Sequence, residues 1–208
     1  MLIHDFKKRL KLGELEQMIN DERARRKLLR LVGYHYRQCG YYYLTLCTQN
    51  RHCLFGRVHR GEMILNDAGK MVHEIWSDIP KKYRGFGNDL FVLMPNHLHG
   101  ILLKYNDGGP TQGSAPTLIL SDVVRYFKMF TTRIYIKGVR EKRFAAFDRR
   151  LWQRNYYEHV IRNETALNRI RQYMIENPLK WSEDQWSDPH VGPHKARIVA
   201  LACRCLKP

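Results

Sequence analysis

The chain has 208 residues, and with 44% hydrophobic and 12% aromatic residues it has the composition of a globular protein with a buried core. No apolar run approaches the roughly 20 residues that span a bilayer, and the N-terminus lacks the apolar segment of a signal peptide. The five cysteines follow no zinc-finger spacing, so we expect a reduced, cytoplasmic protein with no membrane partner.

The charge balance is strongly basic. Lysine and arginine number 36 against 20 acidic residues, which gives a formal net charge of +16. An excess of this size favours a polyanionic partner, usually nucleic acid, and the alternative is a basic surface that serves solubility alone.

The sequence pattern divides the chain into three parts. Residues 1–34 are predicted to form a basic helical N-terminal arm that either packs on the body or lies along a phosphate backbone. Residues 35–182 carry the regular elements of a folded domain. Residues 183–208 are predicted to be an irregular basic C-terminal tail.

Hydrophobic periodicity in the central part predicts alternating strands and helices. In chain order we expect a strand over 41–48, a helix from the Asn66 cap to 79, strands over 89–94 and 97–103, a helix over 121–136, a strand over 151–161 and, after Asn163, a helix over 164–176. The order β-α-β-β-α-β is the ferredoxin-like split arrangement, an α+β fold with two helices on one face of an antiparallel sheet. The other face is left free unless something docks there.

Two histidines stand out in the strand over 97–103. Because side chains alternate along a strand, His97 and His99 point to one face and Leu98 to the other. Two adjacent imidazoles can hold one divalent cation and leave its other positions open. The spacing alone is a weak signal, because the chain contains ten histidines.

The last predicted helix carries Tyr173 and Asn177, four residues apart. This spacing brings two side chains to one side of a helix if the last turn is helical. Pro178 follows directly, and the residue before a proline resists helical geometry, so Asn177 is either the last helical residue or the first non-helical one. A tyrosine on an amphipathic helix is ordinarily part of the core.

Basic residues recur on the second helix and around the last strand. Arg125 and Lys128 lie on that helix, and Arg154 and Arg162 lie in or beside that strand. We predict these four as DNA contacts. The link over 137–150 has six basic against two acidic residues and is a further phosphate-binding candidate.

Four motifs, in order, resemble the single-tyrosine HUH transposases, and most closely the branch of REP-associated tyrosine transposases. They are the segments 42–51 (YYLTLCTQNR), 92–101 (VLMPNHLHGI), 152–163 (WQRNYYEHVIRN) and 173–178 (YMIENP). The resemblance covers about residues 35–182, and four ordered motifs are more specific than one pair of histidines.

The resemblance implies a site and a substrate. His97 and His99 would hold a divalent ion, Mg²⁺ or Mn²⁺, with Asn177 as the third, polar ligand. Tyr173 would be the nucleophile. The implied partner is single-stranded DNA next to imperfect, REP-like hairpins, and the acting species would be a monomer or a homodimer.

The implied chemistry agrees with the properties of the residues. A free tyrosine has a pKa of about 10 and is a poor nucleophile at neutral pH, so attack on a phosphodiester needs a cation that neutralises the phosphate. A tyrosine ester holds the 5′ phosphate and keeps the bond energy, so strands can be rejoined without ATP.

The sequence therefore predicts a metal-dependent single-stranded DNA endonuclease and strand transferase that works through a 5′-phosphotyrosine intermediate. Three alternatives stay open: a non-catalytic protein that binds structured nucleic acid, a rolling-circle replication initiator, and a metallohydrolase that forms no covalent product.

Overall fold

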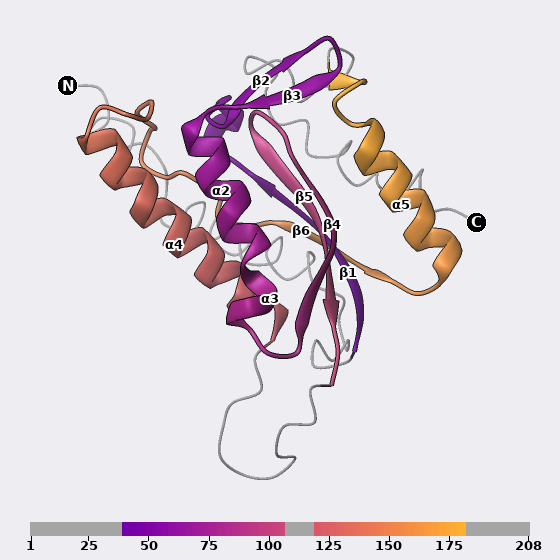
Figure 1. Ribbon diagram of the computed structural model, residues 1–208. Coiled ribbons are helices and arrows are strands. Elements are labelled where there is room, and N and C mark those ends of the chain that lie inside the picture. The colour runs from indigo at the N-terminus through magenta and orange to yellow at the C-terminus, as the bar shows by residue number, and fades with distance from the viewer. Residues whose placement is uncertain (1–38, 107–118, 182–208) are drawn as a thin grey trace, which may run out of the picture. The chain divides into compact units, whose positions relative to one another are not determined.

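The computed structural model describes residues 39–106 and 119–181 (Figure 1). The chain divides into two units, Met1–His35 and Tyr36–Pro208, and every described residue belongs to the second. The predicted N-terminal arm and C-terminal tail lie outside the described residues. In the described part, no helix is both long and apolar enough to cross a lipid bilayer.

Strands and helices alternate along the described part. The elements are β1 (Gly40–Cys47), the short 3-10 helix η2 (Gln49–Arg51), β2 (Gly56–His59), β3 (Glu62–Leu65), α2 (Asp67–Ser77), α3 (Ile79–Lys82), β4 (Phe86–Leu93), β5 (His97–Lys104), α4 (Leu120–Arg140), β6 (Tyr157–Ile161) and α5 (Glu164–Glu176). Four strands form an antiparallel sheet in the order β4-β5-β1-β6, and β2 pairs with β3 in a separate hairpin. The sheet and its two crossover helices follow the predicted β-α-β-β-α-β order, so the α+β, ferredoxin-like fold is confirmed.

The register of β1 and β5 decides which side chains share a face of the sheet. Thr45 lies opposite His99, and Cys47 lies opposite His97. Because side chains alternate along each strand, these four residues point to one face. The other face carries fully buried apolar residues: Tyr42, Leu44, Leu46, Leu98 and Leu102.

Helices α2 and α4 cover this apolar face together (Figure 1). The indole of Trp76 in α2 is fully buried, and its ring centroid lies 5.0 Å from that of Phe127 in α4. Trp76 also lies directly over Gly100 of β5, where an added Cβ would be 2.3 Å from the indole Cζ2 atom. Gly100 is therefore required by close packing, since its missing side chain leaves the space that the indole fills.

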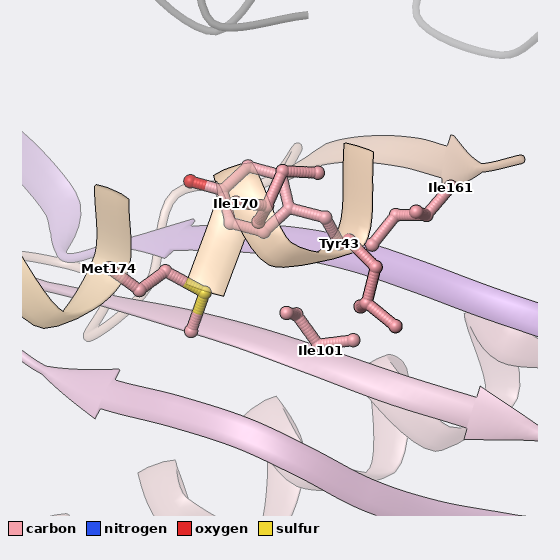
Figure 2. Packing of buried hydrophobic residues seen from close by; sticks show 6 residues of the cluster. Tyr43, Ile101, Ile161, Ile170 and Met174 are labelled. Atoms are coloured by element: carbon pink, nitrogen blue, oxygen red, sulfur yellow. The ribbon is translucent and has the colours of Figure 1, made fainter. Parts of the chain in front are cut away.

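Helix α5 packs on the opposite face of the sheet. The apolar cluster at this interface consists of Tyr43, Ile101, Ile161, Leu167, Ile170 and Met174. Figure 2 shows Ile170 and Met174 projecting from the helix toward Tyr43 and Ile101 on the strands. The face that the sequence leaves free is thus occupied by the last helix of the described chain.

Asparagine caps begin α2 and α5, and the sequence predicts the first of them. The Asn66 side chain accepts a hydrogen bond from the Gly69 N–H at 2.8 Å. The Asn163 side chain accepts one from the Ala166 N–H at 2.8 Å. Each cap satisfies a backbone donor that the first turn of a helix leaves unpaired.

The predicted strand over 151–161 is wrong in its first half. The structure has a strand only over Tyr157–Ile161, and Trp152 makes an isolated bridge with Thr48. The backbone between these points turns its carbonyls to the side chain of Lys128, whose Nζ donates to Gln153 and Asn155 at 2.9 and 3.1 Å. The Lys128 side chain on α4 thus binds carbonyls that would otherwise pair with a neighbouring strand. The local sequence does not predict this contact between distant segments.

The predicted ends of two helices also differ from the structure. Helix α2 ends at Ser77, and Ile79 and Pro80 instead begin the short helix α3. Proline is well accepted in the first turn of a helix, so Pro80 starts an element here as well as ending one. Helix α4 continues to Arg140, four residues beyond the predicted end.

The hairpin β2–β3 is absent from the sequence-based prediction. Its turn residues Arg60 and Gly61 both have positive φ, 52° and 77°, as two-residue hairpin turns require. Arginine is an unusual first residue for such a turn, so the sequence lacks the Asn-Gly or Asp-Gly pattern that would predict the hairpin. A Cβ at Gly61 would lie 2.6 Å from Cδ2 of Leu179, so the turn rests against the chain just after α5 (Figure 1).

Replacing Gly100 with alanine is expected to destabilise the fold by about 1–3 kcal/mol, because the new methyl group collides with the buried Trp76 indole. Urea unfolding monitored by tryptophan fluorescence measures the change. Gly87→Ala is the matched control, since a Cβ at this strand glycine has its nearest neighbour at 3.7 Å. Equal stability of the two variants would contradict the packing role of Gly100.

Candidate active site

The two predicted histidines lie side by side in the centre of the sheet, on the face that α5 covers. His97 is 0% exposed and His99 is 3% exposed. Their ring centroids are 4.6 Å apart. The alternation of β5 therefore places both imidazoles together in a site from which solvent is largely excluded.

A hydrogen-bond chain fixes the tautomer of His97. The Asn96 side chain donates through Nδ2 to the Arg51 carbonyl at 3.1 Å, which turns its Oδ1 toward His97 at 2.8 Å from Nδ1. Since this oxygen can only accept, Nδ1 of His97 carries the proton and Nε2 carries the lone pair. A ring nitrogen held in this way orients the other nitrogen for a ligand.

His99 is oriented by two hydroxyl groups of β1. Its Nδ1 lies 2.8 Å from the Tyr43 hydroxyl and 2.9 Å from the Thr45 hydroxyl. The Tyr43 ring also stacks on the imidazole, with centroids 5.5 Å apart. With Nδ1 held by β1, Nε2 is the nitrogen of His99 suited to bind a ligand.

Burial keeps both imidazoles neutral. It lowers the pKa of His97 well below its usual value, and the neighbouring His99 lowers it further, while a polar contact with Asn177 opposes the shift and Arg51 adds to it. Burial lowers the pKa of His99 to about 3. Neutral imidazole is the form that binds metal ions, so both side chains are ready for coordination at physiological pH.

Asn177 completes the polar side of the site. It is the C-terminal cap of α5, with helical backbone angles (φ −57°, ψ −44°), and is 4% exposed. Of the two geometries that the sequence left open, the helical one is present. In the described part of the chain, no cluster of three or more His, Cys, Asp or Glu side chains could hold a metal ion.

Tyr173 lies one turn before Asn177 on α5. It is half-buried beside the apolar cluster, and its ring centroid is 5.6 Å from that of His99. The pKa of Tyr43 is raised well above its usual value. Burial is the largest cause, and the electrostatic effect of Tyr173 is the second. The structure thus brings Tyr173 to the same site as the two histidines.

Arg51 is a residue at this site that the sequence analysis did not single out. Its side chain is 8% exposed, and its charge contributes to the lowered pKa of His97. Its backbone is left-handed, with φ 57° after φ 56° at Asn50. Asparagine favours this conformation, but nothing in the local sequence predicts a buried arginine beside a histidine.

The four predicted DNA contacts are not gathered at the site. Arg125, Arg154 and Arg162 are exposed, and Arg125 pairs with Asp122 at 3.3 Å. Lys128 binds backbone carbonyls of the loop before β6 and carries a pKa lowered to about 8 by burial. Lys128 therefore has a structural role, and the contacts of all four with DNA stay predictions.

An ion pair joins α5 to the edge strand β4 of the sheet. The guanidinium group of Arg171 in α5 donates to both carboxylate oxygens of Asp89 in β4, through Nε to Oδ2 at 2.9 Å and through Nη2 to Oδ1. The Asp89 side chain is 15% exposed, and the second acid near Arg171, Glu164, is 73% exposed at 3.4 Å. Asp89 is therefore the partner that restrains the helix.

Asp89→Asn is expected to destabilise the fold by about 1–2 kcal/mol, because a bidentate, partly buried ion pair is lost. Hydrogen exchange should show the largest loss of protection in α5. The matched control is Glu164→Gln, which removes the exposed partner of the same arginine and should change stability by less than about 0.5 kcal/mol. The reverse order of the two variants would exclude this role for Asp89.

The stability of the metal-free protein should fall as the pH drops below about 6.5. Unfolded histidines take up protons there, whereas His99 stays neutral in the folded state until about pH 3. Each such histidine adds a slope of up to about 1.4 kcal/mol per pH unit. Urea unfolding in EDTA should show this slope reduced in His99→Gln but not in His59→Gln, which changes an exposed histidine. If the free energy of unfolding depended on pH equally in His99→Gln and the parent, the predicted contribution of His99 would be refuted.

No protein-family model matches the chain. Two transposases are among the solved structures that resemble it. A candidate transposase of Deinococcus radiodurans R1 has 20% identity and a TM-score of 0.43, and the alignment covers 72% of this chain and 96% of that one. A REP-associated tyrosine transposase bound to a REP hairpin has 20% identity and a TM-score of 0.49, with 86% of this chain and 88% of that one covered.

A sequence relative is more similar. An uncharacterized protein of Haemophilus influenzae (strain ATCC 51907 / DSM 11121 / KW20 / Rd) is 38% identical over 172 residues, which are 77% of this chain and 92% of the relative. The chain belongs to the same protein family as this Haemophilus influenzae protein.

Proposed function

We propose that this chain is a transposase-like enzyme, a metal-dependent endonuclease and strand transferase for single-stranded DNA that works through a 5′-phosphotyrosine intermediate on Tyr173. The substrate we infer is a single strand next to a hairpin, and the branch we infer is that of the REP-associated tyrosine transposases. Both inferences rest on the resemblance of the four sequence motifs to that family.

One observation carries the proposal: two distant elements bring the chemically required groups to one place. His97 and His99 come from the central strand β5, and Tyr173 comes from α5 at the end of the described chain. The rings of His99 and Tyr173 lie 5.6 Å apart at centroids. Groups with strongly shifted pKa values gather at functional sites, and both imidazoles beside Tyr173 have strongly lowered ones.

The residues present fit a divalent metal ion. Nε2 of His97, Nε2 of His99 and the side-chain oxygen of Asn177 would hold it, and two nitrogen ligands with one neutral oxygen suit a labile Mn²⁺ or Mg²⁺ with positions left for phosphate oxygens. When bound, the ion would neutralise the phosphate and stabilise charge on the leaving oxygen.

The chain's own residues account for the rest of the reaction. The Tyr173 oxygen attacks phosphorus, the bond from phosphorus to the 3′ oxygen breaks, and the phosphate stays on the tyrosine as a 5′ ester. The phenol gives its proton to water, and the departing 3′ oxygen takes a proton from water. Tyr43, whose raised pKa keeps it protonated, holds His99 in place and does not compete as nucleophile.

The decisive test incubates the protein with Mg²⁺ or Mn²⁺ and 3′-labelled hairpin oligonucleotides that carry single-stranded flanks. We expect a denaturant-resistant protein–DNA adduct that carries the label. Tyr173→Phe should abolish the adduct and lower cleavage at least about 1,000-fold, because it removes the nucleophile. Tyr105→Phe is the control, since Tyr105 is 42% exposed and should retain activity.

The other readouts separate the rival functions. His99→Gln should weaken Mn²⁺ binding, measured by electron paramagnetic resonance, at least about tenfold, and EDTA should prevent adduct formation. Cleavage without an adduct would indicate a metallohydrolase, and hairpin binding without cleavage would indicate a non-catalytic binder. Cleavage that needs no hairpin and follows the sequence of a replication origin would indicate a rolling-circle initiator.

A further inference from the structure

A dense group of cations follows the outer side of α4 into the loop after it. Seven basic and two acidic residues lie between residues 133 and 150, and all seven cations are exposed. We call this group the basic platform: Arg133, Lys137, Arg140, Lys142, Arg143, Arg149 and Arg150.

The helical part of the basic platform points away from the protein core. Helix α4 buries one side, which includes Phe127, Thr131 and Tyr135. Arg133 and Arg140 are seven residues apart, two turns of an α-helix, so they share one side of α4. Both lie roughly opposite the buried side, in line with their exposure. The helical part of the basic platform is thus an exposed cationic surface on the outside of α4.

Aromatic packing holds the loop part of the platform in a fixed shape. The rings of Phe144 and Phe147 lie 5.2 and 5.5 Å from that of Tyr135, which is fully buried. Gly138 makes this return possible, because a Cβ there would be 2.2 Å from the Phe144 ring. The cations of the loop are therefore displayed from an anchored backbone.

One cation occupies a position where glycine would be more favourable. Helix α4 ends in a pair of hydrogen bonds, from the Lys142 N–H to Val139 at 3.0 Å and from the Arg143 N–H to Gly138 at 2.8 Å. This is the Schellman ending, whose left-handed residue is usually glycine. Here that residue is Lys142, with φ 57°. The chain accepts a less favourable helix end and gains a cation on the basic platform.

Few of these charges are neutralised within the described residues. Glu141 pairs with Arg143 and, at 3.8 Å, with Lys137, and Asp148 lies 4.0 Å from Arg149. No ion pair within the described ranges involves Arg133, Arg140 or Lys142. Exposed cations that form no ion pair attract an external polyanion.

We propose that the basic platform binds the phosphate backbone of duplex DNA, as a second nucleic-acid surface separate from the active site. The two lie on opposite sides of the sheet, since α4 covers one face and α5 the other (Figure 1). The inference rests on the proposed function only in identifying the duplex as the paired stem of the hairpin substrate.

The composition of the platform favours a phosphate backbone over an acidic protein. Five of the seven cations are arginines, whose planar guanidinium groups bind phosphate with two hydrogen bonds. Two apolar side chains of α4, Met129 and Ile136, are also exposed, at 57% and 37%, so the cations outnumber the exposed apolar groups of this surface. A fixed array of cations also suits a partner of fixed shape, such as a paired stem, with its regular phosphates.

The test measures binding of the full chain to a blunt, fully paired, fluorescein-labelled DNA duplex by anisotropy over a series of salt concentrations. The variant Arg133→Gln/Arg140→Gln/Lys142→Gln should bind about tenfold or more weakly, and its salt slope should fall by about 2–3, near 0.9 for each lost phosphate contact. Mn²⁺ binding, measured by electron paramagnetic resonance, should be unchanged, because the three substituted cations lie outside the candidate active site.

Matched controls separate the platform from net charge. Lys70→Gln/Lys81→Gln/Arg84→Gln removes three exposed cations elsewhere and should leave duplex affinity within about twofold. Equal losses in the two triple variants, or none in the platform variant, would overturn the proposal. So would loss of binding to phosphatidylserine vesicles with unchanged duplex binding, which would identify a membrane surface instead.

Lys142→Gly gives a readout that a purely structural residue would not. It should raise the unfolding temperature, because glycine suits the left-handed helix end, and at the same time weaken duplex binding. A rise in unfolding temperature with unchanged binding would count against the platform. Because the duplex is uncleavable and binding is scored without catalysis, a failure of the platform and a failure of the phosphotyrosine mechanism are told apart.

Discussion

The packing of α5 on the sheet is the interaction on which the candidate site depends. The metal-ligating candidates His97 and His99 lie on a central strand, whereas Tyr173 and Asn177 belong to a helix that no strand pairing holds. The apolar cluster around Tyr43 and the ion pair between Arg171 and Asp89 are the contacts that bring the two halves together. Burial of apolar side chains supplies most of the free energy that holds α5 on the sheet. The ion pair fixes the orientation of the helix, because its hydrogen bonds are directional.

The docking also explains the electrostatics of the site. Closing α5 over the sheet excludes water from two imidazoles, and burial is the first cause of the lowered pKa of both. The cost of burying polar rings is offset by the hydrogen bond that His97 donates to Asn96 and by those that join His99 to the hydroxyls of Tyr43 and Thr45. The same contact therefore assembles the site and sets its protonation state.

Much of this architecture can be predicted from the sequence, because it follows from periodicity. The alternation of β5 places His97 and His99 on one face, and the four-residue spacing on α5 places Tyr173 near Asn177. What the sequence does not reveal depends on contacts between distant segments. The shortened strand β6 reflects the hold of Lys128 on the preceding carbonyls, and the burial of Arg51 reflects its place beside His97. No local pattern encodes either contact.

The hairpin β2–β3 is also a feature that local sequence does not predict. Its contact with the chain after α5 limits where relatives can accept insertions. Hairpin tips are ordinarily the places where chains accept insertions most easily. Here the tip is not free, since Gly61 lies in van der Waals contact with Leu179, two residues after Asn177. A longer or bulkier turn would push on the chain at the point where α5 ends and would shift Asn177, the proposed oxygen ligand, relative to the histidines. Variation in length among relatives should therefore avoid this turn and accumulate elsewhere on the surface.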